Sequence, residues 1–323
     1  MPGSKVKIGV LTSGGDAPGM NAALRAVVRR ALSAGHQVYG IRRGYEGLLN
    51  GEAFPMDLGS VADIIHRGGT ILHTARSERF KQPEYQDQAA AWIKQSGLEG
   101  LVVIGGEGTF KGMVELCNRG VSAVGVPATI DNDIPHTDYS IGFDTAVNTG
   151  VEAVNRLRDT ATSHERVFVV ETMGRHSGQL ALAVGVAGGA ESILIPELPI
   201  DLDNVCARLE RGIARGKVHS IIVVAEGAAK GFEVAGEIEK CMGTEIRVTV
   251  LGHVQRGGTP TAFDRLLASR MGAKAVDALC SGLSNVMVAV SGTELRLVPL
   301  NQVIGVKKKI DMEVFRLAED LAR

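Results

Sequence analysis

The chain has 323 residues, enough for about two domains. Apolar residues make up 45% and charged residues 22%, so the sequence can form a full core and is neither disordered nor collagen-like. Lysine and arginine (35) nearly balance aspartate and glutamate (36), which argues against a broad basic surface for nucleic acid or anionic lipid. No apolar run reaches the roughly 18 residues of a membrane span, and no signal-peptide pattern opens the sequence. We therefore expect a cytoplasmic protein whose partners include no nucleic acid and no membrane.

Short β-branched runs alternate with amphipathic segments from end to end. Strands bounded by glycine and separated by 10–20 residues of helical pattern indicate βαβ units, parallel sheets and an α/β fold. The loop at 134–139 is the best candidate for a first crossing between domains, and the charge run at 307–309 predicts a solvated helix start. In chain order, we predict strands at 6–11, 38–42, 101–104, 121–126, 166–171, 192–195, 220–225 and 247–251. We predict helices at 20–32, after the GGEGT turn through Cys117, and at 144–162.

The four cysteines stand far apart in the sequence, at Cys117, Cys206, Cys241 and Cys280. Their spacing is typical of neither a disulfide scaffold nor a zinc ribbon. We therefore expect buried, free thiols, as in other cytosolic proteins.

Two glycine-rich turns follow predicted strands and precede predicted helices. The first is TSGGDAPGMN at 12–21, and the second is GGEGT at 105–109, which adds the carboxylate of Glu107. Glycine lets backbone N–H groups approach a phosphate, a helix N-terminus favours an anion, and a carboxylate suits phosphate-bound Mg²⁺. Glycines can also merely form tight βα turns. The two turns together favour a nucleotide, although no Walker A lysine is present.

A third loop, ATIDNDIP at 128–135, places Asp131 and Asp133 two residues apart. Such spacing is also common in ordinary turns. In the functional interpretation, one aspartate accepts a proton from a substrate hydroxyl while the other supports Mg²⁺.

Arginines also recur at strand ends, where a planar guanidinium can bind phosphate oxygens in two places. Each one alone is more often a surface ion pair, and His253 is equally compatible with a buried structural histidine. The residues alone thus indicate a Mg-dependent phosphoryl transferase or nucleotide binder acting on a small anion. The positions concerned are Arg76, Arg166, Arg175, Arg247, His253 and Arg256.

These motifs, in this order, resemble those of bacterial-type ATP-dependent 6-phosphofructokinases. The matching segments are GVLTSGGDAPGMNAA, IGGEGT, TIDNDI, ETMGRHSG and VLGHVQRGGTPTAFDR, and the likeness runs from residue 5 nearly to the C-terminus. The resemblance implies two Rossmann-like three-layer α/β domains with mainly parallel sheets, in a homotetramer. A larger ATP-binding domain would contain 1–141 plus 254–304, and a smaller sugar-phosphate-binding domain 142–253 plus 305–323.

The resemblance also implies site residues and the reaction, phosphoryl transfer from MgATP to the 1-hydroxyl of fructose 6-phosphate. Asp131 would be the general base, flanked by Thr129 and Asp133, and Arg175 would steady the transferred phosphoryl group. ATP would be held by Gly15, Arg76, Ser77, Gly106, Glu107, Gly108 and Thr109, with Mg²⁺ at Glu107. The sugar phosphate would contact Thr129, Asp131, Met173, Gly174, Arg175, Glu226, His253 and Arg256, with Arg166 and Arg247 reaching in from a neighbouring subunit. An ADP or phosphoenolpyruvate effector would use Arg25, Arg29, Arg158, Glu191, Arg215 and Lys217.

Several positions depart from the commonest pattern of that family or separate its branches. Glu107 stands where aspartate is usual, which lengthens the arm to Mg²⁺ by one methylene. Ala128 and Gly108 are small, which leaves room for the nucleotide and favours ATP over pyrophosphate. Leu58 stands where well-regulated relatives carry an effector-binding arginine, so we expect weak activation by ADP and weak inhibition by phosphoenolpyruvate.

Three alternatives remain. A pyrophosphate-dependent phosphofructokinase is the nearest. A lipid or NAD kinase also carries a GG(D/E)GT turn, but that turn alone does not explain TIDND or GHVQRGG. A catalytically silent metabolite sensor would keep the arginines and lose the base, whereas Asp131 is present.

Overall fold

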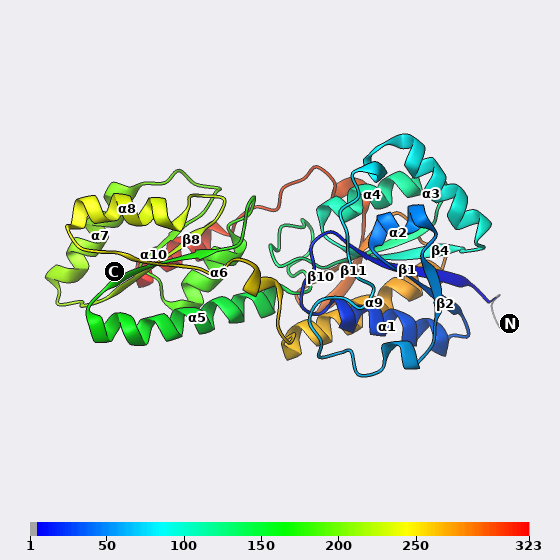
Figure 1. Cartoon of the computed structure of the whole chain (residues 1–323), viewed down its shortest axis with the longest axis horizontal. Helices are drawn as coiled ribbons and strands as arrows, with labels where there is room; N and C mark the ends of the chain where they lie inside the picture. Colours follow the sequence, from blue (N-terminus) through cyan, green and yellow to red (C-terminus); the bar gives the residue numbers. More distant parts are fainter. Residues whose placement is uncertain (1–4, 323) are drawn as a thin grey trace. The chain divides into compact units, whose positions relative to one another are not determined.

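The computed structural model describes residues 5–322. The chain forms two compact units (Figure 1), each of which is an α/β sandwich. The first contains the chain up to Ile130, Ile134–Asp144 and Arg256–Lys308. The second contains Asp131–Asp133, Thr145–Gln255 and the chain from Lys309 onward.

The first unit is built on a seven-stranded sheet of order β11-β10-β5-β4-β1-β2-β3. The five strands from β10 to β2 are parallel, and the edge strands β3 and β11 are antiparallel to their neighbours. Every residue of β4 and β5 is buried, as expected for strands covered on both faces. The strands are β1 (Lys7–Ser13), β2 (Gln37–Ile41), β3 (Ala53–Met56), β4 (Gly100–Gly105), β5 (Ala123–Pro127), β10 (Val286–Ser291) and β11 (Glu294–Pro299).

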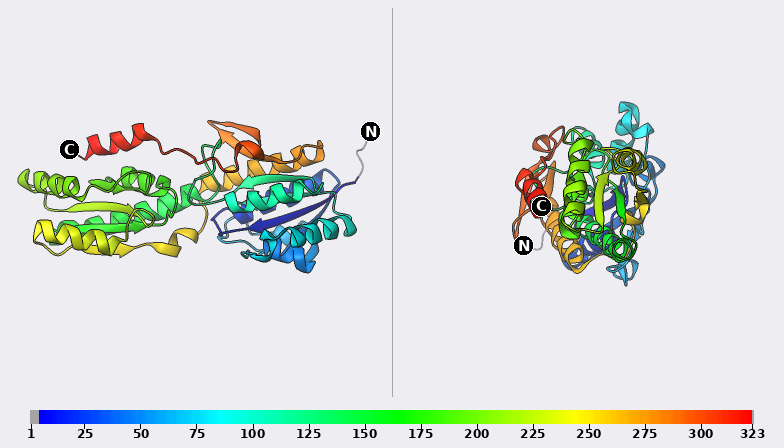
Figure 2. Two further views of the ribbon diagram at one scale, coloured as in Figure 1. Left: turned by 90° about the horizontal axis from the view of Figure 1, so that it is seen from above. Right: turned by 90° about the vertical axis from the view of Figure 1, so that its left-hand side faces the viewer.

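Helices cover both faces of this sheet (Figure 2). α1 packs on α9 at one face, while α2, α3 and α4 pack together at the other. Phe110, Leu101 and Leu48 are among the buried side chains that fill the space between α2–α4 and the sheet. The helices are α1 (Met20–Ser33), α2 (Gly44–Asn50), α3 (Pro83–Gln95), α4 (Glu107–Cys117) and α9 (Ala262–Cys280), with short 3₁₀ turns η1 (Gly59–Val61), η2 (Arg79–Lys81) and η4 (Leu300–Gln302).

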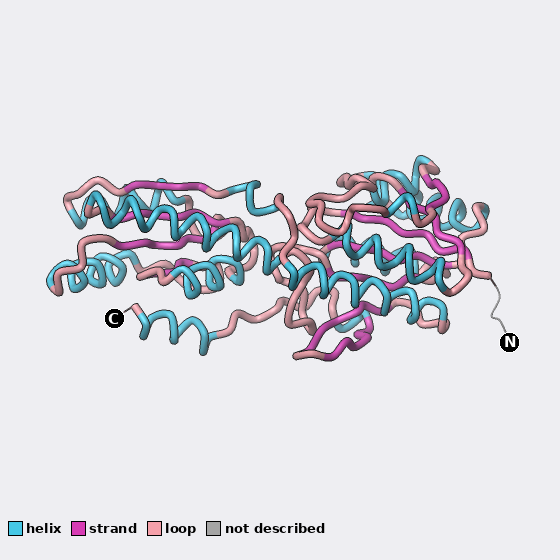
Figure 3. Tube along the Cα trace, turned by 90° about the horizontal axis from the view of Figure 1, so that it is seen from below, coloured by secondary structure: helices cyan, strands magenta, loops and turns pink. Residues whose placement is uncertain are grey.

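The second unit has a four-stranded, fully parallel sheet of order β7-β8-β6-β9. Its strands lie between helices, as the magenta strands and cyan helices of Figure 3 show. α7 and α8 pack against one another over a core that includes Ile222, Leu209 and Ile238, while α6 contacts both β8 and α10. The elements are α5 (Phe143–His164, which starts in the first unit), β6 (Val167–Thr172), α6 (Gln179–Gly188), β7 (Ser192–Leu194), α7 (Leu202–Ala214), β8 (Ser220–Ala225), α8 (Gly231–Met242), β9 (Arg247–Val250), η3 (Gly252–Arg256, whose last residue belongs to the first unit) and α10 (Met312–Leu321).

The predicted α/β class with mainly parallel sheets is confirmed, and a strand lies at each predicted position. The predicted helix start at 307–309 is wrong. Lys308 Nζ instead donates to the carbonyls of Thr137 (2.8 Å) and Asp138 (2.9 Å), and α10 begins only at Met312. The side chain of Asp311 caps that helix by accepting from the N–H groups of Glu313 and Val314, and aspartate is among the preferred capping residues. In the part of the chain that the structure describes, no helix is long and apolar enough to cross a membrane.

The prediction of four buried free thiols is also wrong. Cys206 on α7 and Cys241 on α8 form a disulfide, with Cα atoms 6.5 Å apart. They are 35 residues apart in sequence, and only the packing of α7 on α8 brings them together. Of the two free cysteines, Cys117 is partly buried and Cys280 is exposed. Burial raises the pKa of the Cys117 thiol, and partial desolvation raises that of Cys280.

Candidate active site

The carboxyl ends of β1, β4 and β5 are in register in the first unit. Ser13 pairs with Gly105, and Gly105 pairs with Pro127. In open α/β sheets, ligands bind at the carboxyl edge of the strands. The residues that leave the sheet together at this edge are Gly14 and Gly15 after β1, Gly106 and Glu107 after β4, and Ala128 and Thr129 after β5.

The turn after β1 is fixed by hydrogen bonds from two threonines. Thr109 Oγ1 donates to the carbonyl of Ser13 (2.9 Å), and Thr74 Oγ1 donates to that of Gly14 (2.7 Å). Gly14 has a φ of +85°, which glycine adopts without steric cost. The hydroxyl of Thr109, which was predicted to bind the nucleotide, therefore ties the two glycine turns together.

The turn after β4 opens directly into α4. Gly106 is the N-cap without a side-chain cap, and Glu107 lies in the first helical turn. Glu107 Oε1 lies 2.8 Å from Lys111 Nζ, and a Cβ added at Gly108 would meet no atom within 4 Å. A helix N-terminus with open space beside it suits a phosphate group.

Mg²⁺ usually keeps several waters and takes one or two protein carboxylates together with substrate phosphates. Among residues 5–322, no group of three or more His, Cys, Asp or Glu side chains is arranged to hold a metal ion. Glu107, a partly exposed carboxylate at a helix N-terminus, fits the role of a single protein donor.

Arg256, at the end of η3, lies over the turn after β1. Its Nη1 donates to the carbonyl of Asp16 (3.3 Å). A Cβ added at Gly15 would collide with the same Nη1. Glycine at position 15 is thus what allows the guanidinium to approach the backbone.

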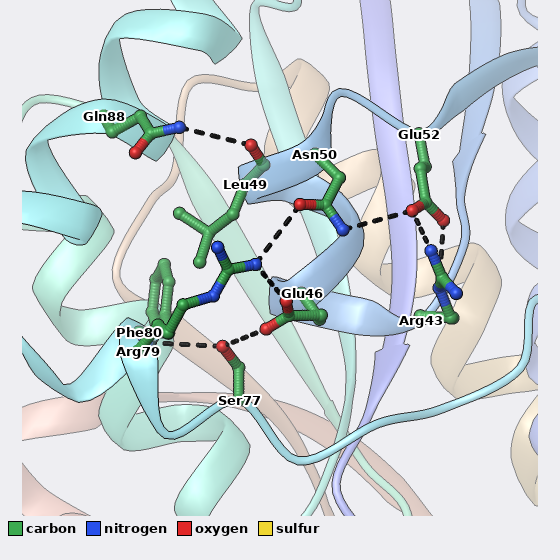
Figure 4. A network of polar contacts seen from close by, with 9 residues as sticks. All are labelled: Arg43, Glu46, Leu49, Asn50, Glu52, Ser77, Arg79, Phe80 and Gln88. Atoms are coloured by element: carbon green, nitrogen blue, oxygen red, sulfur yellow. Dashed lines mark hydrogen bonds and ion pairs between the residues drawn. The ribbon is translucent and has the colours of Figure 1, made fainter.

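Arg76 and Ser77 lie in the segment before η2. Ser77 belongs to a polar network around Glu46 of α2 (Figure 4). Ser77 Oγ donates to Glu46 Oε2 (2.6 Å), and Arg79 forms an ion pair with the same carboxylate. The hydrogen bond from Ser77 and then the interaction with Arg79 lower the pKa of Glu46 below 4.5. Arg76 is exposed, and its guanidinium takes part in no ion pair with another described residue.

The loop after β5 carries the predicted catalytic aspartate. Thr129 follows the strand, and its carbonyl accepts from Ser140 Oγ (2.7 Å). Within the second unit, Ser177 Oγ donates to the carbonyl of Asp131 (3.2 Å). Asn132, between the two aspartates, has a φ of +47°, a left-handed conformation that asparagine tolerates.

The segment after β6 carries Met173, Gly174 and Arg175. The N–H of Met173 donates to Gln255 Oε1 (2.8 Å), and Gly227 N donates to the carbonyl of Gly174 (3.2 Å). A Cβ at Gly227 would collide with the carbonyl of Arg175. Arg175 itself is exposed, so the backbone of this segment is held firmly while its guanidinium remains accessible.

The other predicted sugar-phosphate residues also lie near strand ends of the second unit. Arg247 Nη1 pairs with Glu245 Oε1 at 2.7 Å, and Glu226 N bonds the carbonyl of Thr172 at 2.9 Å. His253 is exposed, which excludes the alternative of a buried structural histidine. Arg166 lines a cavity of about 500 Å³ together with Lys217.

Several predicted effector residues cluster at another place in the second unit. Lys217 pairs with Glu191, whose other oxygen accepts from the N–H of Ile221. Arg158 donates to the carbonyl of Gly189 (2.9 Å). Burial, followed by the charge of Arg158, lowers the pKa of His219 beside them. The remaining members lie elsewhere: Arg25 and Arg29 on α1, and Arg215 at the C-terminal end of α7.

Sequence reasoning missed several residues that shape these segments. A side chain that acts through a backbone hydrogen bond leaves no spacing signal. The only signal for Gln255 is its place between His253 and Arg256 in GHVQRGG. The missed residues are Glu46, Thr74, Lys111, Ser177, Gly227 and Gln255.

The family model described as Phosphofructokinase matches residues 7–279. The chain belongs to the phosphofructokinase family. Curated relatives named ATP-dependent 6-phosphofructokinase from Halalkalibacterium halodurans and Natranaerobius thermophilus are each 56% identical over 316 residues, which cover 98% of this chain and 99% of each relative.

Solved phosphofructokinase structures share the fold. Pichia pastoris phosphofructokinase in the T-state aligns with a TM-score of 0.89 and 33% identity, over 98% of this chain and 39% of that one. A pyrophosphate-dependent phosphofructokinase from Marinobacter aquaeolei aligns with a TM-score of 0.84 at only 24% identity, over 95% of this chain and 86% of that one. The second likeness concerns the fold alone.

Proposed function

We propose that this phosphofructokinase-family chain transfers the γ-phosphoryl group of MgATP to the 1-hydroxyl of fructose 6-phosphate, giving fructose 1,6-bisphosphate and ADP in glycolysis. The observation that carries the proposal is the register of Ser13, Gly105 and Pro127. It brings two glycine-rich turns, and the loop that leads to Asp131, to one edge of one sheet. Phosphoryl transfer needs this combination, because the donor phosphates and the group that accepts the hydroxyl proton must lie close together.

In this proposal the first unit is the ATP-binding domain. Gly15, Gly106 and Thr109 shape the turns that receive the triphosphate, and the open space at Gly108 leaves room for it. Glu107 would hold Mg²⁺, which neutralises charge on the phosphates when bound. Lys111, paired with Glu107, adds a positive charge beside the same turn. Arg76 and Ser77 would complete the nucleotide site, with Ser77 acting through Glu46.

Asp131 is the proposed general base. A sugar alcohol is almost fully protonated near neutral pH, so a positioned carboxylate helps as the proton leaves. Thr129 and Asp133 flank it in the same loop. The larger demand is electrostatic, because the transferred phosphoryl group passes through a loose transition state whose negative oxygens need fixed cations. Arg175 and Arg76, both exposed and not engaged in ion pairs with other described residues, would supply that charge.

The second unit would bind the sugar phosphate. Met173, Gly174, Glu226 and His253 would contact it. Arg256, which lies beside Gly15 in the first unit, is a further proposed contact. We further propose that the chain works as a cytoplasmic homotetramer, in which Arg166 and Arg247 reach a neighbour's 6-phosphate. The effector residues named above would bind ADP or phosphoenolpyruvate. Leu58 is 54% exposed, so an apolar side chain stands on the surface at the position where well-regulated relatives carry an arginine.

ATP is favoured over pyrophosphate as the donor. Ala128 and Gly108 are both small, and the relatives named ATP-dependent are 53–56% identical, against 22–24% for the pyrophosphate-dependent structures. One assay tests donor and acceptor together. Fructose 6-phosphate is supplied with MgATP or with magnesium pyrophosphate, and production of fructose 1,6-bisphosphate is followed. We expect turnover with MgATP and less than about one hundredth of it with pyrophosphate, a difference of at least ~2.7 kcal/mol in activation free energy. Equal or greater turnover with pyrophosphate would contradict the donor assignment.

Weak regulation is the expected consequence of Leu58. The measurement is the dependence of rate on fructose 6-phosphate, with and without phosphoenolpyruvate and ADP. A sigmoidal curve steepened by phosphoenolpyruvate and straightened by ADP would contradict this expectation.

A further inference from the structure

Gln255 is a completely buried polar residue in η3, with an exposed fraction of 0%. Its Oε1 accepts a hydrogen bond from the backbone N–H of Met173 at 2.8 Å, across 82 residues of sequence. Its neighbours in η3 are His253 and Arg256, two of the proposed sugar-phosphate residues. Gln255 therefore links the backbone of one segment of the proposed site to the 3₁₀ turn that carries another.

The segment from Met173 to Gly178 depends on such links, because it follows β6 and precedes α6 without belonging to either. Gly174 has a φ of +127°. At the far end of the segment, the N–H of Gly178 donates to both carboxylate oxygens of Glu197, at 2.8 and 3.1 Å. At the start of the segment, Gln255 holds the N–H of Met173, which lies two residues before Arg175.

Glutamine at this position has a cost in stability as well as a benefit. The Nε2 of Gln255 is buried and has no hydrogen-bond partner among residues 5–322. A buried amide with an unsatisfied donor costs stability. An apolar side chain of similar volume would avoid that cost but would leave the buried N–H of Met173 without this acceptor. What glutamine offers in return is an acceptor oxygen at the end of a side chain of the right length for the N–H of Met173.

We propose that Gln255 is a positioning residue for the sugar-phosphate site. By holding the N–H of Met173, it sets the spacing between the segment that bears Arg175 and the turn that bears His253. The inference rests on the proposed function. It concerns a residue that touches neither substrate and acts through the groups on either side of it.

The test compares Gln255→Met, which removes the acceptor at similar volume, with Gln255→Glu, which keeps an oxygen at the same place. No described residue accepts a hydrogen bond from Nε2, so the glutamate loses no bond of that kind. Gln86→Met is the matched control, because Gln86 is also a buried glutamine (6% exposed) whose Nε2 bonds a backbone carbonyl, that of Phe80, at 2.9 Å. Thermal midpoints, kcat and both KM values are measured for the full-length protein.

We expect Gln255→Met to raise KM for fructose 6-phosphate about tenfold and to lower kcat, with KM for MgATP unchanged within about twofold. Gln255→Glu should return KM for the sugar phosphate to within about threefold of the wild-type value. Gln86→Met should lower the thermal midpoint without changing that KM. An unchanged KM in Gln255→Met, or equal changes in both KM values, would overturn the role of Gln255.

Two further readouts keep the outcomes separable. If the wild-type protein does not phosphorylate fructose 6-phosphate, the proposed function itself is wrong. If the wild-type protein is active and Gln255→Met has the same kinetics, only the positioning role of Gln255 is wrong. If Gln255→Met does not fold, the rate of hydrogen exchange at the Met173 amide of the wild-type protein tests the proposal instead. We expect strong protection there, and exchange as fast as in an open loop would overturn the proposal.

Discussion

Gly15 and Arg256 occupy the same small space: a Cβ atom at position 15 would collide with the Nη1 atom of the arginine. That guanidinium also donates to the carbonyl of Asp16, at 3.3 Å. The turn proposed to receive ATP and a residue proposed to contact the sugar phosphate are therefore in direct contact. A larger side chain at position 15 must therefore displace the guanidinium of Arg256.

Gly15→Ala tests this relationship. Gly15 does not have a positive φ, so alanine is compatible with the backbone and we expect the thermal midpoint to change little. The added methyl group should displace the guanidinium and raise KM for fructose 6-phosphate about tenfold, even though position 15 is on the nucleotide side. Steady-state kinetics with each substrate varied in turn provide the measurement.

A double-mutant cycle supplies the control. If Gly15→Ala acts by displacing Arg256, it should raise KM for fructose 6-phosphate much less in an Arg256→Gln background. The coupling free energy between the two changes should be about 1 kcal/mol. Strictly additive effects of the two changes would show that the collision has no functional consequence. Gly236→Ala, at a helical position where a Cβ meets no atom within 4 Å, controls for effects of the added methyl group alone.

The Cys206–Cys241 disulfide closes a loop of 35 residues and joins α7 to α8. Restricting the unfolded chain by a loop of this length is expected to stabilise the second unit by about 4 kcal/mol. A reductant should therefore lower the unfolding midpoint of the wild-type protein and leave that of a Cys206→Ser/Cys241→Ser double variant unchanged. Catalytic turnover should survive in both, because neither cysteine belongs to the proposed site.

Counting thiols gives a direct check of the same bond. Denatured, unreduced protein should react as two free thiols, those of Cys117 and Cys280, and reduced protein as four. Four reactive thiols in protein purified without reductant would show that the bond does not form under those conditions.

Acid should weaken the network around Glu46. Its pKa is lowered below 4.5 by Ser77 and Arg79, so its contribution to folding is complete above pH 4.5 and is lost as pH falls through the lower, folded-state pKa. Because the pair is partly exposed, we expect Glu46→Gln to cost about 1 kcal/mol at pH 7. The measurement is urea unfolding of both proteins from pH 7 to pH 3. The difference in unfolding free energy between the two proteins should disappear as the pH falls below 4.5. A difference that stays constant over the whole range would mean that the charge of Glu46 contributes nothing to stability.

Much of the fold could be predicted because its strands are buried on both faces. Runs such as Leu101–Ile104 and Ser220–Ala225 read as uninterrupted apolar segments, and the glycines after them mark the ends of strands. The antiparallel edge strands β3 and β11 have no such run and were not predicted. β10 was not predicted either, although it is parallel to β5 and mostly buried. In β11, exposed residues alternate with partly buried ones and none is buried, so the strand lacks a continuous apolar run.

The site could be predicted in part, for a related reason. Residues such as Glu107 and Asp131 stand in glycine-rich or turn-forming motifs next to strands, where composition points to them. Gln255 could not be found in this way, because its role depends on a hydrogen bond to a residue 82 positions away. The disulfide could not be predicted either, because it depends on how α7 and α8 pack. The prediction of a helix start at 307–309 was wrong because Lys308 donates hydrogen bonds to loop carbonyls instead.

The role of Asp131 is the central claim, and the kinetics of Asp131→Ser at saturating MgATP and fructose 6-phosphate test it most directly. Removing a base that acts in the transition state should lower kcat by about 100-fold or more and leave KM for MgATP nearly unchanged. Asp203→Ser, an exposed aspartate in the first turn of α7, should retain wild-type kinetics. A variant of Asp131 that keeps wild-type kcat and only raises KM would contradict the account.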